Sequence, residues 1–422
     1  MDAEPHPAPA RPLAAFAVPN YRRFVIGQSV SLVGSWTETV AQALLVLALT
    51  HSGLWLGLAT AARYLPVLLL TPYAGLIVDR ADKRTVLLIT QASLAVVSLV
   101  LGALVLLGAV ELWMVFAVAL VFGALTAFDN PARLAFVPEM VGPRLIRSAV
   151  TLNSTFVNVG RALGPVVAAT LVAGVGIGWC FVVNGVSFAG VLAALLTLDT
   201  SRLSKGVRVD HHARQLREGL AYARRVPEIL APLCMMALIG TFTYEFEVSL
   251  PLFARGPLAG GATTYSWLMG AFGFGSVLGG IYSTRHAKTG VPRMIRAAVL
   301  YMLAMFATAC TASVVAAVLL LLVVGFASII FLTTGNSTIQ LAAAPAYRGR
   351  ITALWSTAFV GSTPIGATII GAIGGASPRI ALVAGGVACG AAAITGIAVL
   401  TRTRARTNAG LRPPLVLRAS GD

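Results

Sequence analysis

The chain has 422 residues, of which 57% are hydrophobic and only 11% are charged, and its mean hydropathy is +0.85. Soluble domains carry roughly 25% charged residues, so a soluble fold is excluded because too little polar surface remains to cover one. The net charge of +16 would favour nucleic acid as the partner of a soluble protein. Here the basic residues lie in short gaps between apolar runs, so no nucleic-acid partner is expected.

The N-terminal tail, residues 1–20, contains Asp2, Glu4 and five prolines, and it lacks the basic start of a signal peptide. Twelve apolar runs follow, each long enough to cross a hydrocarbon core of about 30 Å as a helix. The predicted spans are 24–49, 55–78, 85–108, 112–136, 150–173, 177–198, 229–253, 265–284, 293–312, 314–340, 351–374 and 378–401. The sequence therefore predicts an all-α membrane protein with twelve transmembrane helices.

The longest gap, residues 199–228, divides the spans into six and six. It predicts one six-helix bundle over 21–198, a second over 229–401, and a basic tail over 402–422. Of the 31 lysines and arginines, 26 fall in the two tails and in alternate gaps, whereas the opposite gaps hold only Arg255 and Arg379. The positive-inside rule then predicts a multi-pass protein of the plasma or inner membrane with both termini and the central loop cytoplasmic.

Within the central loop, apolar residues recur at helical spacing over 216–225, which is typical of a short amphipathic helix on the inner leaflet; a solvated linker is the alternative. An internal repeat also emerges at an offset of 202 residues. Pro143 corresponds to Pro345, 152–155 (LNST) to 354–357 (LWST), and Gly164 to Gly366. Parallel repeats of six helices are one way in which transporters build two halves around a central site.

The gap after the second span reads GLIVDRADKR over residues 75–84, and this resembles the G-x-L-a-D-r-x-G-r-k signature of the major facilitator superfamily. Asp82 stands where the signature has its second glycine. The resemblance implies the major facilitator fold, in which Gly75 permits close helix approach and Asp79 meets the positive N-terminus of the eleventh helix. It also implies that Lys83 reaches an acid at the end of the fourth span, for which Asp129 is the candidate. The expected conformational latch comprises Gly75, Asp79, Arg80, Lys83, Arg84 and Asp129.

The fifth span contains GRALGPVVAA over residues 160–169, which resembles the g-x-x-x-G-P-x-x-G-G antiporter motif of proton-coupled exporters, with alanines in place of the last two glycines. Gly160 and Gly164 would allow close helix contact, and Pro165 would permit a bend. Ordinary packing of small residues is the alternative. Stretches at 31–36 (SLVGSW), 128–133 (FDNPAR) and 244–251 (YEFEVSLP) are similar to the enterobactin-exporter-like, or transmembrane secretion effector, branch.

Ionisable residues inside the predicted spans are functional candidates, because each is costly in a bilayer. The resemblance implies that spans one, four, seven and ten line the central cavity, which places Glu38 and Glu245 on facing helices. Either could carry a coupling proton; the alternative is static pairing with an arginine. The full set of coupling candidates is Glu38, Glu245, Glu247, Arg161 and Arg63, and the cavity candidates are Trp36, Gln42 and Tyr244. Of the two neighbouring glutamates, Glu245 is preferred for the cavity, since residues two apart on a helix face different ways.

The sequence has no nucleotide-binding G-x-x-x-x-G-K-[ST] motif, and no cofactor or metal site is expected. The prediction is a secondary active transporter, functional as a monomer, that exports a small amphipathic compound such as a drug, antibiotic or siderophore in exchange for protons. Import, or lysophospholipid flipping by the same fold, is the first alternative. A membrane-embedded sensor or enzyme is the remote one, since the predicted spans contain no histidine and no nucleophile–base cluster.

Overall fold

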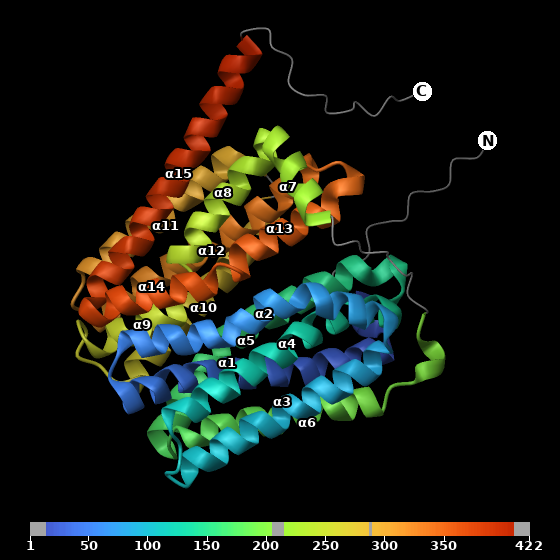
Figure 1. Ribbon diagram of the computed structural model, residues 1–422, viewed down its shortest axis with the longest axis vertical. Helices are drawn as coiled ribbons and strands as arrows, with labels where there is room; N and C mark the ends of the chain where they lie inside the picture. Colours follow the sequence, from blue (N-terminus) through green and yellow to red (C-terminus); the bar gives the residue numbers. More distant parts are fainter. Residues whose placement is uncertain (1–13, 205–214, 287–288, 409–422) are drawn as a thin grey trace. The chain divides into compact units, whose positions relative to one another are not determined.

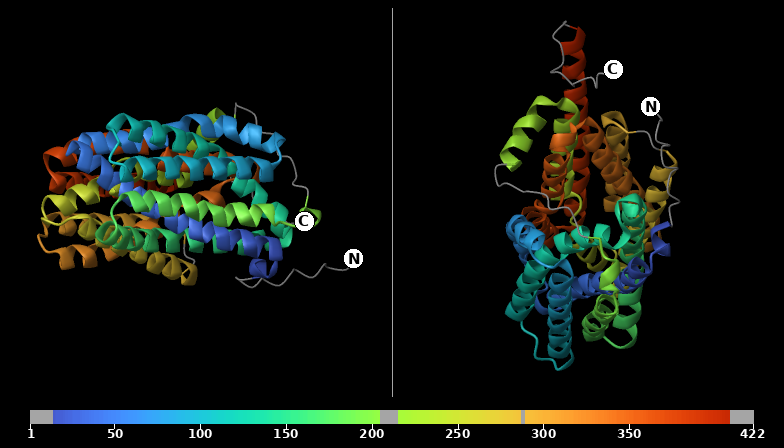
Figure 2. Two further views of the ribbon diagram at one scale, coloured as in Figure 1. Left: turned by 90° about the horizontal axis from the view of Figure 1, so that it is seen from below. Right: turned by 90° about the vertical axis from the view of Figure 1, so that its right-hand side faces the viewer.

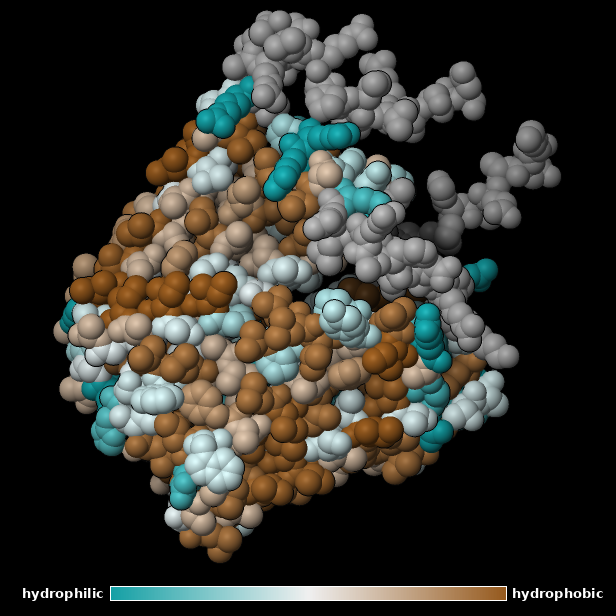
Figure 3. Space-filling view, in the orientation of Figure 1, coloured by the Kyte–Doolittle hydropathy of each residue, from teal (hydrophilic) through white to brown (hydrophobic). Residues whose placement is uncertain are grey.

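The computed structural model describes residues 14–204, 215–286 and 289–408. Within these ranges every regular element is a helix and no strand occurs (Figure 1), which confirms the all-helical class. Apolar side chains dominate the face drawn in Figure 3. This surface composition agrees with a chain whose solvent is mostly lipid.

Each of the first six predicted spans corresponds to one continuous helix. These helices are α1 (Pro19–Thr50), α2 (Gly53–Arg80), α3 (Lys83–Leu106), α4 (Leu112–Val141), α5 (Ile146–Gly174) and α6 (Gly178–Leu196). The short 3-10 turns of this half are η1 (Ala14–Ala17), η2 (Pro143–Leu145) and η3 (Thr200–Arg202).

In the second half, two predicted spans are interrupted. The helices are α7 (Gln215–Arg225), α8 (Pro227–Phe242), α9 (Phe246–Arg255), α10 (Ala262–Arg285), α11 (Val291–Cys310), α12 (Val314–Ala342), α13 (Arg348–Val360), α14 (Thr363–Ala376) and α15 (Pro378–Asn408), with the turn η4 (Pro345–Tyr347) before α13. The seventh span is the pair α8–α9, and the eleventh is the pair α13–α14.

Eleven helical segments of the described residues are long and apolar enough to cross a membrane, where the sequence predicts twelve. The difference is the predicted span 265–284. It forms α10, which is rich in glycine and hydroxyl residues and is not among the eleven. These small residues serve packing: a Cβ on Gly275 would lie 2.1 Å from the carbonyl oxygen of Leu322 in α12. The count of twelve stays a prediction.

Two compact units divide the chain: Met1–Leu45 with Leu69–Asp210, and Val46–Leu68 with His211–Asp422. In the first unit α3 packs on α4 and on α6, and in the second α10 packs on α12 and α11 on α15 (Figure 2). The end of α1 and the first half of α2 belong to the second unit by their contacts. The predicted bundle boundaries themselves stay predictions.

The repeat predicted at an offset of 202 residues is confirmed by the element bounds. Adding 202 to the bounds of α5 gives 348–376, the first and last residues of α13–α14. The same offset relates η2 to η4, and α4 to α12 within one residue at its end. From the fourth span to the fifth, the two halves thus share element bounds as well as sequence matches.

The helix predicted in the central loop is confirmed as α7, but it packs on protein in the second unit. Glu218 pairs with Arg350 at 2.9 Å, and the Tyr222 ring stacks on Tyr347 at 4.2 Å. The hydroxyl of Tyr222 also accepts a hydrogen bond from the amide of Ala344 at 3.2 Å. These contacts fix α7 to the start of α13, so α7 is neither a solvated linker nor held by lipid alone.

Candidate functional site

The seventh span is interrupted between α8 and α9. The amides of Thr243 and Tyr244 both donate to the carbonyl of Ile239, at 2.9 and 3.2 Å. Helical bonding restarts at the Glu245 carbonyl, which accepts from two amides of α9 at 3.1 and 2.9 Å. Non-helical backbone at membrane depth is tolerated where protein or a cavity satisfies it, and such interruptions commonly form transporter binding sites.

Glu245 lies in this interruption and is 3% exposed. Its Oε1 atom has no hydrogen-bond partner among the described residues. Thr363, the first residue of α14, is a hydrogen-bonding neighbour of the carboxylate, and a Cβ on Gly366 would lie 2.9 Å from Oε1. Glycine at 366 therefore allows the first turn of α14 to pack directly on this carboxylate.

The interruption of the eleventh span lies against the interruption of the seventh. Only Gly361 and Ser362 separate α13 from α14. A Cβ on Gly240, near the end of α8, would lie 2.7 Å from the carbonyl oxygen of Ala358 and 3.1 Å from Oγ of Ser362. The two broken helices thus approach closely at a glycine, and this arrangement surrounds Glu245.

Glu247 has a different environment from Glu245, although both belong to the second unit. It is half-buried, and its Oε1 accepts a hydrogen bond from the hydroxyl of Tyr64 in α2 at 3.2 Å. Tyr265 of α10 is close enough to interact electrostatically with Glu247. The hydroxyl of Tyr265 is fully buried and has no hydrogen-bond partner among the described residues. Arg63 lies beside this group and interacts electrostatically with Tyr64.

Tyr244 is held by neighbouring helices. Its hydroxyl donates to the carbonyl of Ser328 in α12 at 2.9 Å, and its ring meets Phe359 of α13 edge-on at 4.9 Å. These contacts support the packing role of this ring and leave its predicted role in a cavity as a prediction.

In the first unit, Glu38 is 1% exposed and lies among α1, α3 and α6. Its Oε2 accepts hydrogen bonds from Oγ of Ser98 at 2.6 Å and from Nδ2 of Asn184 at 2.5 Å. No ion pair joins Glu38 to Arg161 within the described part of the chain. The carboxylate therefore ties three helices together through neutral donors.

Arg161, the other embedded candidate of this unit, stacks its guanidinium over the ring of Trp36 at 4.9 Å. Its Nε atom has no hydrogen-bond partner among the described residues. Trp36 is half-buried and Gln42 is buried. The pairing of Trp36 with Arg161 places a cation–π contact on a helix predicted to line the cavity.

The glycines of the antiporter-like motif bring α5 against α1. A Cβ on Gly164 would lie 2.3 Å from Cβ of Trp36, and one on Gly160 would lie 3.1 Å from Cβ of Leu32. The carbonyl of Gly164 accepts a hydrogen bond from Oγ1 of Thr37 at 3.0 Å. Pro165, next in sequence, has no amide hydrogen to give to α5. The predicted close contact at Gly160 and Gly164 is confirmed, while the motif's role in antiport stays a prediction.

The expected contact between Lys83 and Asp129 is wrong. Lys83 pairs with Glu139 at 3.1 Å, whereas Asp129 accepts hydrogen bonds from Thr90 and Gln91 at 3.0 and 2.7 Å. Ten residues separate Asp129 from Glu139 on α4, a rise of about 15 Å. Asp129 therefore lies too deep for Lys83 at the very start of α3; its ion pair, at 3.4 Å, is with Arg133.

The remaining residues of the signature organise the ends of helices. Asp82 is the N-cap of α3, and its carboxylate accepts from the amide and the hydroxyl of Thr85 at 2.9 and 2.5 Å. The bond from the Thr85 hydroxyl holds the pKa of Asp82 below its usual value. Arg84 donates to the carbonyl of Leu195 at the end of α6 at 2.8 Å. Asp82 thus performs a capping role that the glycine of the signature could not.

Gly75, Asp79 and Arg80 end α2 on the same side of the first unit as Asp82. A Cβ on Gly75 would meet no atom within 4 Å. The helix expected to approach it, the eleventh, belongs to the other unit, so this contact and the latch stay predictions.

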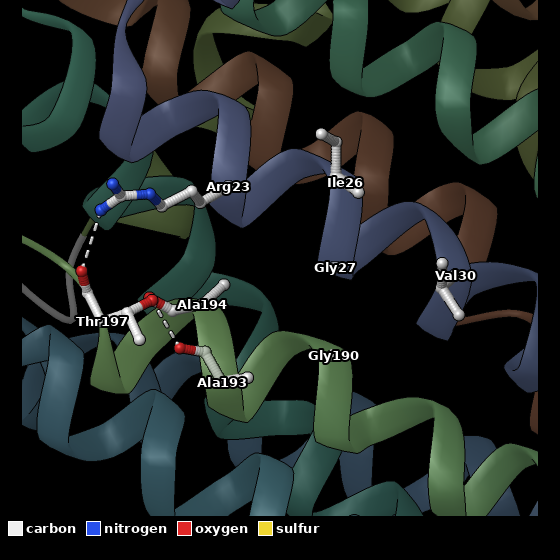
Figure 4. A pocket seen from close by; sticks show the side chains of 8 residues that line it. All are labelled: Arg23, Ile26, Gly27, Val30, Gly190, Ala193, Ala194 and Thr197. Carbon is white, nitrogen blue, oxygen red and sulfur yellow. Dashed lines mark hydrogen bonds between the residues drawn. The ribbon is translucent and has the colours of Figure 1, made fainter.

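A shallow groove runs between α1 and α6 of the first unit (Figure 4). Its walls are mostly apolar, and Arg23 at one end donates to the carbonyl of Thr197 at 3.1 Å. Gly27 and Gly190 form its floor, where a Cβ on Gly27 would lie 2.5 Å from the carbonyl oxygen of Gly190. Glu38 is fifteen residues from Arg23 along α1, about 22 Å. The groove is therefore separate from the embedded carboxylates.

Sequence reasoning missed Tyr64, Ser98, Asn184, Tyr265 and Thr363 as neighbours of the embedded glutamates. A signal exists for Asn184, a polar residue in the middle of an apolar span, and for Tyr64, which follows Arg63. Ser98, Tyr265 and Thr363 become neighbours of the glutamates only when helices far apart in the sequence pack together. No three His, Cys, Asp or Glu side chains of the described residues lie together as metal ligands.

The family model of the transmembrane secretion effector matches residues 10–414. This chain belongs to the transmembrane secretion effector family. It is therefore a multi-pass membrane transporter of the major facilitator type and not an enzyme, and the resemblance predicted from its motifs is confirmed.

The chain is similar in sequence to several characterised transporters. It is 30% identical over 142 residues to the staphyloferrin A transporter of Staphylococcus aureus, and the match covers 33% of this chain and 36% of that protein. It is 27% identical over 240 residues to macrolide efflux protein A of Streptococcus pyogenes, covering 55% and 56%. It is 22% identical over 361 residues to the enterobactin exporter EntS of Escherichia coli, covering 84% and 85%. The first relatives are thus matched over about a third to three fifths of their length.

Solved structures share the fold at low identity. A bacterial homologue of the human lysosomal transporter Spinster matches with a TM-score of 0.71 at 14% identity, covering 91% of this chain and 96% of that one. A transporter of the POT family matches with a TM-score of 0.72 at 11% identity, covering 92% and 96%. These transporters have the same helical fold as this chain.

Proposed function

We propose that this secretion effector exports a small amphipathic compound, such as a drug, antibiotic or siderophore, in exchange for protons. Relatives named for enterobactin export and macrolide efflux support outward transport of an organic compound. The absence of a nucleotide-binding motif from the sequence supports an ion gradient as the energy source. By the charge distribution, both termini face the cytoplasm.

The proposed proton coupling rests on the surroundings of Glu245, a buried carboxylate whose Oε1 has no hydrogen-bond partner among the described residues. A carboxylate with an unpaired oxygen is costly in a low-dielectric interior, and binding a proton offsets that cost. Glu38 is equally buried, but its Oε2 already accepts from Ser98 and Asn184, so a change of charge there would disturb two hydrogen bonds. We therefore assign the transported proton to Glu245 and a structural role to Glu38.

Glu245 lies where the interruptions of the seventh and eleventh spans meet. A change in its charge therefore affects the packing of both spans at the points where their helices are broken. In the charged form it is anchored at the first turn of α14, beside Thr363, where the positive end of the helix dipole favours an anion. Protonation weakens that attraction. The gain and loss of one proton can thus alter how α14 packs on α8 and α9, which is the kind of coupling that alternating access requires.

The test uses inside-out membrane vesicles containing the full chain and three radiolabelled probes: erythromycin, enterobactin and tetraphenylphosphonium. We expect uptake of at least one probe when the vesicle interior is acidified, and its collapse on addition of an uncoupler. Uptake of none of the three would refute the export proposal, and uptake only by right-side-out vesicles would indicate import. Glu245→Gln should abolish gradient-driven uptake while preserving probe exchange without a gradient.

Two variants serve as controls for this assignment. Glu38→Gln should lower stability yet retain the response to the pH gradient in the protein that folds. Glu228→Gln removes an exposed carboxylate from the first turn of α8, and it should behave as the wild type. Unchanged gradient-driven uptake by Glu245→Gln would show that another group carries the proton.

A further inference from the structure

The two glutamates of α8–α9 differ in what can reach them. Glu245 is 3% exposed and is enclosed by α14, so its surroundings suit a proton and nothing larger. Glu247 is half-buried, and Tyr64 and Tyr265 from two other helices lie around it. The same short segment therefore presents one enclosed carboxylate and one that is only half-buried.

The side chains around Glu247 offer oxygen acceptors. Tyr64 donates its only hydroxyl hydrogen to Glu247, which leaves the lone pairs of its oxygen free to accept. Tyr265 is fully buried, and its hydroxyl makes no hydrogen bond within the described residues. A buried polar group without a partner costs free energy unless a ligand completes it. The orphan hydroxyl is thus an independent indication of a ligand at this position.

The balance of charge in this group is negative. When Glu245 has released its proton, Glu245 and Glu247 bring two negative charges and Arg63 one positive charge. The C-terminal end of α8 and the N-terminal end of α9 meet here with opposite partial charges, so the side chains decide the sign. One monovalent cation would leave the group neutral.

We propose that Glu247, Tyr64 and Tyr265 form a binding site for a protonated amine of the transported compound. The carboxylate would accept a charge-assisted hydrogen bond, the two phenol oxygens would accept the remaining N–H groups, and the rings would add cation–π attraction. The proposal rests on the proposed transport function and narrows its substrate class to amphipathic amines. All three residues belong to the second unit.

The test measures equilibrium binding to the full chain in lipid nanodiscs, with empty nanodiscs as the blank. The probes are 1-naphthylmethylamine, 1-naphthylmethanol and 1-naphthoate, which share a ring and differ only in one substituent. We expect the amine to bind about tenfold more tightly than either other probe, because one close charge pair in a partly buried site is of order tenfold in affinity. Equal affinity for the three probes would overturn the proposal.

Variants then locate the site. Glu247→Gln should weaken amine binding about tenfold and leave alcohol binding unchanged; Tyr64→Phe and Tyr265→Phe should each weaken amine binding a few fold, while Glu228→Gln should change neither. An amine preference that survives Glu247→Gln would refute the assignment. If Glu247→Gln does not fold, Glu247→Asp and the two phenylalanine variants carry the test. Nanodiscs hold no proton gradient, so the binding assay and the vesicle assay are independent. Loss of the amine preference would overturn the amine site but not proton-driven export, and failure of export in vesicles would not alter the binding result.

Discussion

Substituting Gly164 by alanine tests whether α1 and α5 are held together by the absence of a side chain. The new Cβ would lie 2.3 Å from Cβ of Trp36 and 3.0 Å from the amide nitrogen of Thr37. An ordinary carbon–carbon contact needs roughly 3.6 Å, so the helices must separate by about 1.3 Å. Since Cβ of Trp36 is fixed to the backbone, no rotamer change can relieve the overlap.

The cost follows from this displacement. Overpacking of this kind costs about 1–3 kcal/mol. The hydrogen bond from Thr37 to the Gly164 carbonyl, now 3.0 Å, would lengthen beyond bonding range and cost about 1 kcal/mol more. Alanine recovers up to about 1 kcal/mol through its better helix propensity. The net destabilisation is therefore about 1–3 kcal/mol.

The assay is thermal unfolding of the purified chain in detergent, followed by size-exclusion chromatography of the surviving fold. Two further glycines of α5 provide matched controls. A Cβ on Gly174 would meet no atom within 4 Å, and one on Gly160 would lie 3.1 Å from Cβ of Leu32. We expect the Gly174 variant to match or exceed the wild type, the Gly160 variant to be slightly weaker, and the Gly164 variant to be weakest. A Gly164→Ala protein as stable as Gly174→Ala would refute the close-contact reasoning.

Three other predictions concern helix ends and charge pairs. Asp82→Ala should destabilise the fold by about 1 kcal/mol through loss of the α3 N-cap. Because the pKa of Asp82 is lowered in the folded state, the ionic part of this stabilisation should be complete above about pH 4 and should vanish as pH falls through the lowered pKa. Measuring the stability of the wild type and of Asp82→Asn across pH will check this. Charge reversal at Lys83 or at Glu139 alone should destabilise the fold by up to about 1 kcal/mol, and reversing both charges together should restore the stability. A double-mutant cycle that instead showed coupling between Lys83 and Asp129 would contradict the observed ion pair. Tyr222→Ala should release α7 from α13, seen as faster hydrogen exchange over 218–225 than in the control variant Arg224→Ala, and equal exchange in the two would argue that α7 is held by other contacts.

Much of the helical architecture was predictable because the bilayer imposes it. Apolar runs of sufficient length predicted α1–α6 to within five residues at each end, and the repeat offset anticipated that α5 and α13–α14 have equivalent bounds. The interruptions at 243–245 and 361–362 were not predictable from the same pattern. No proline lies in 243–245, and that break depends on helices that meet only in the folded chain. The break at 361–362 has a local cause, because Pro364, the second residue of α14, has no amide hydrogen to donate to the carbonyl of Val360.

The partners of the embedded charges were less predictable than their presence. Cost in the bilayer identified Glu38 and Glu245 as unusual, but the donors to Glu38 lie 60 and 146 residues away in sequence. The error over Lys83 has a related cause. A sequence motif gives the order of charged residues along two helices. The helical rise per residue then determines that Glu139, and not Asp129, lies beside the start of α3.

The contrast between Glu38 and Glu245 bears on how a duplicated transporter acquires two unlike halves. Both residues lie near the middle of the first span of their half, and both are buried. α1 runs without interruption from Pro19 to Thr50, so its backbone is satisfied within the helix and Glu38 can be used to fasten α3 and α6. In the second half the equivalent span is broken beside Glu245, and the carboxylate keeps an oxygen unpaired. Equivalent spans of the two halves therefore do not have the same chemistry. If the transported proton binds where a charge is least well satisfied, it binds in the half whose helices are interrupted, which is also the half whose backbone has the freedom to respond.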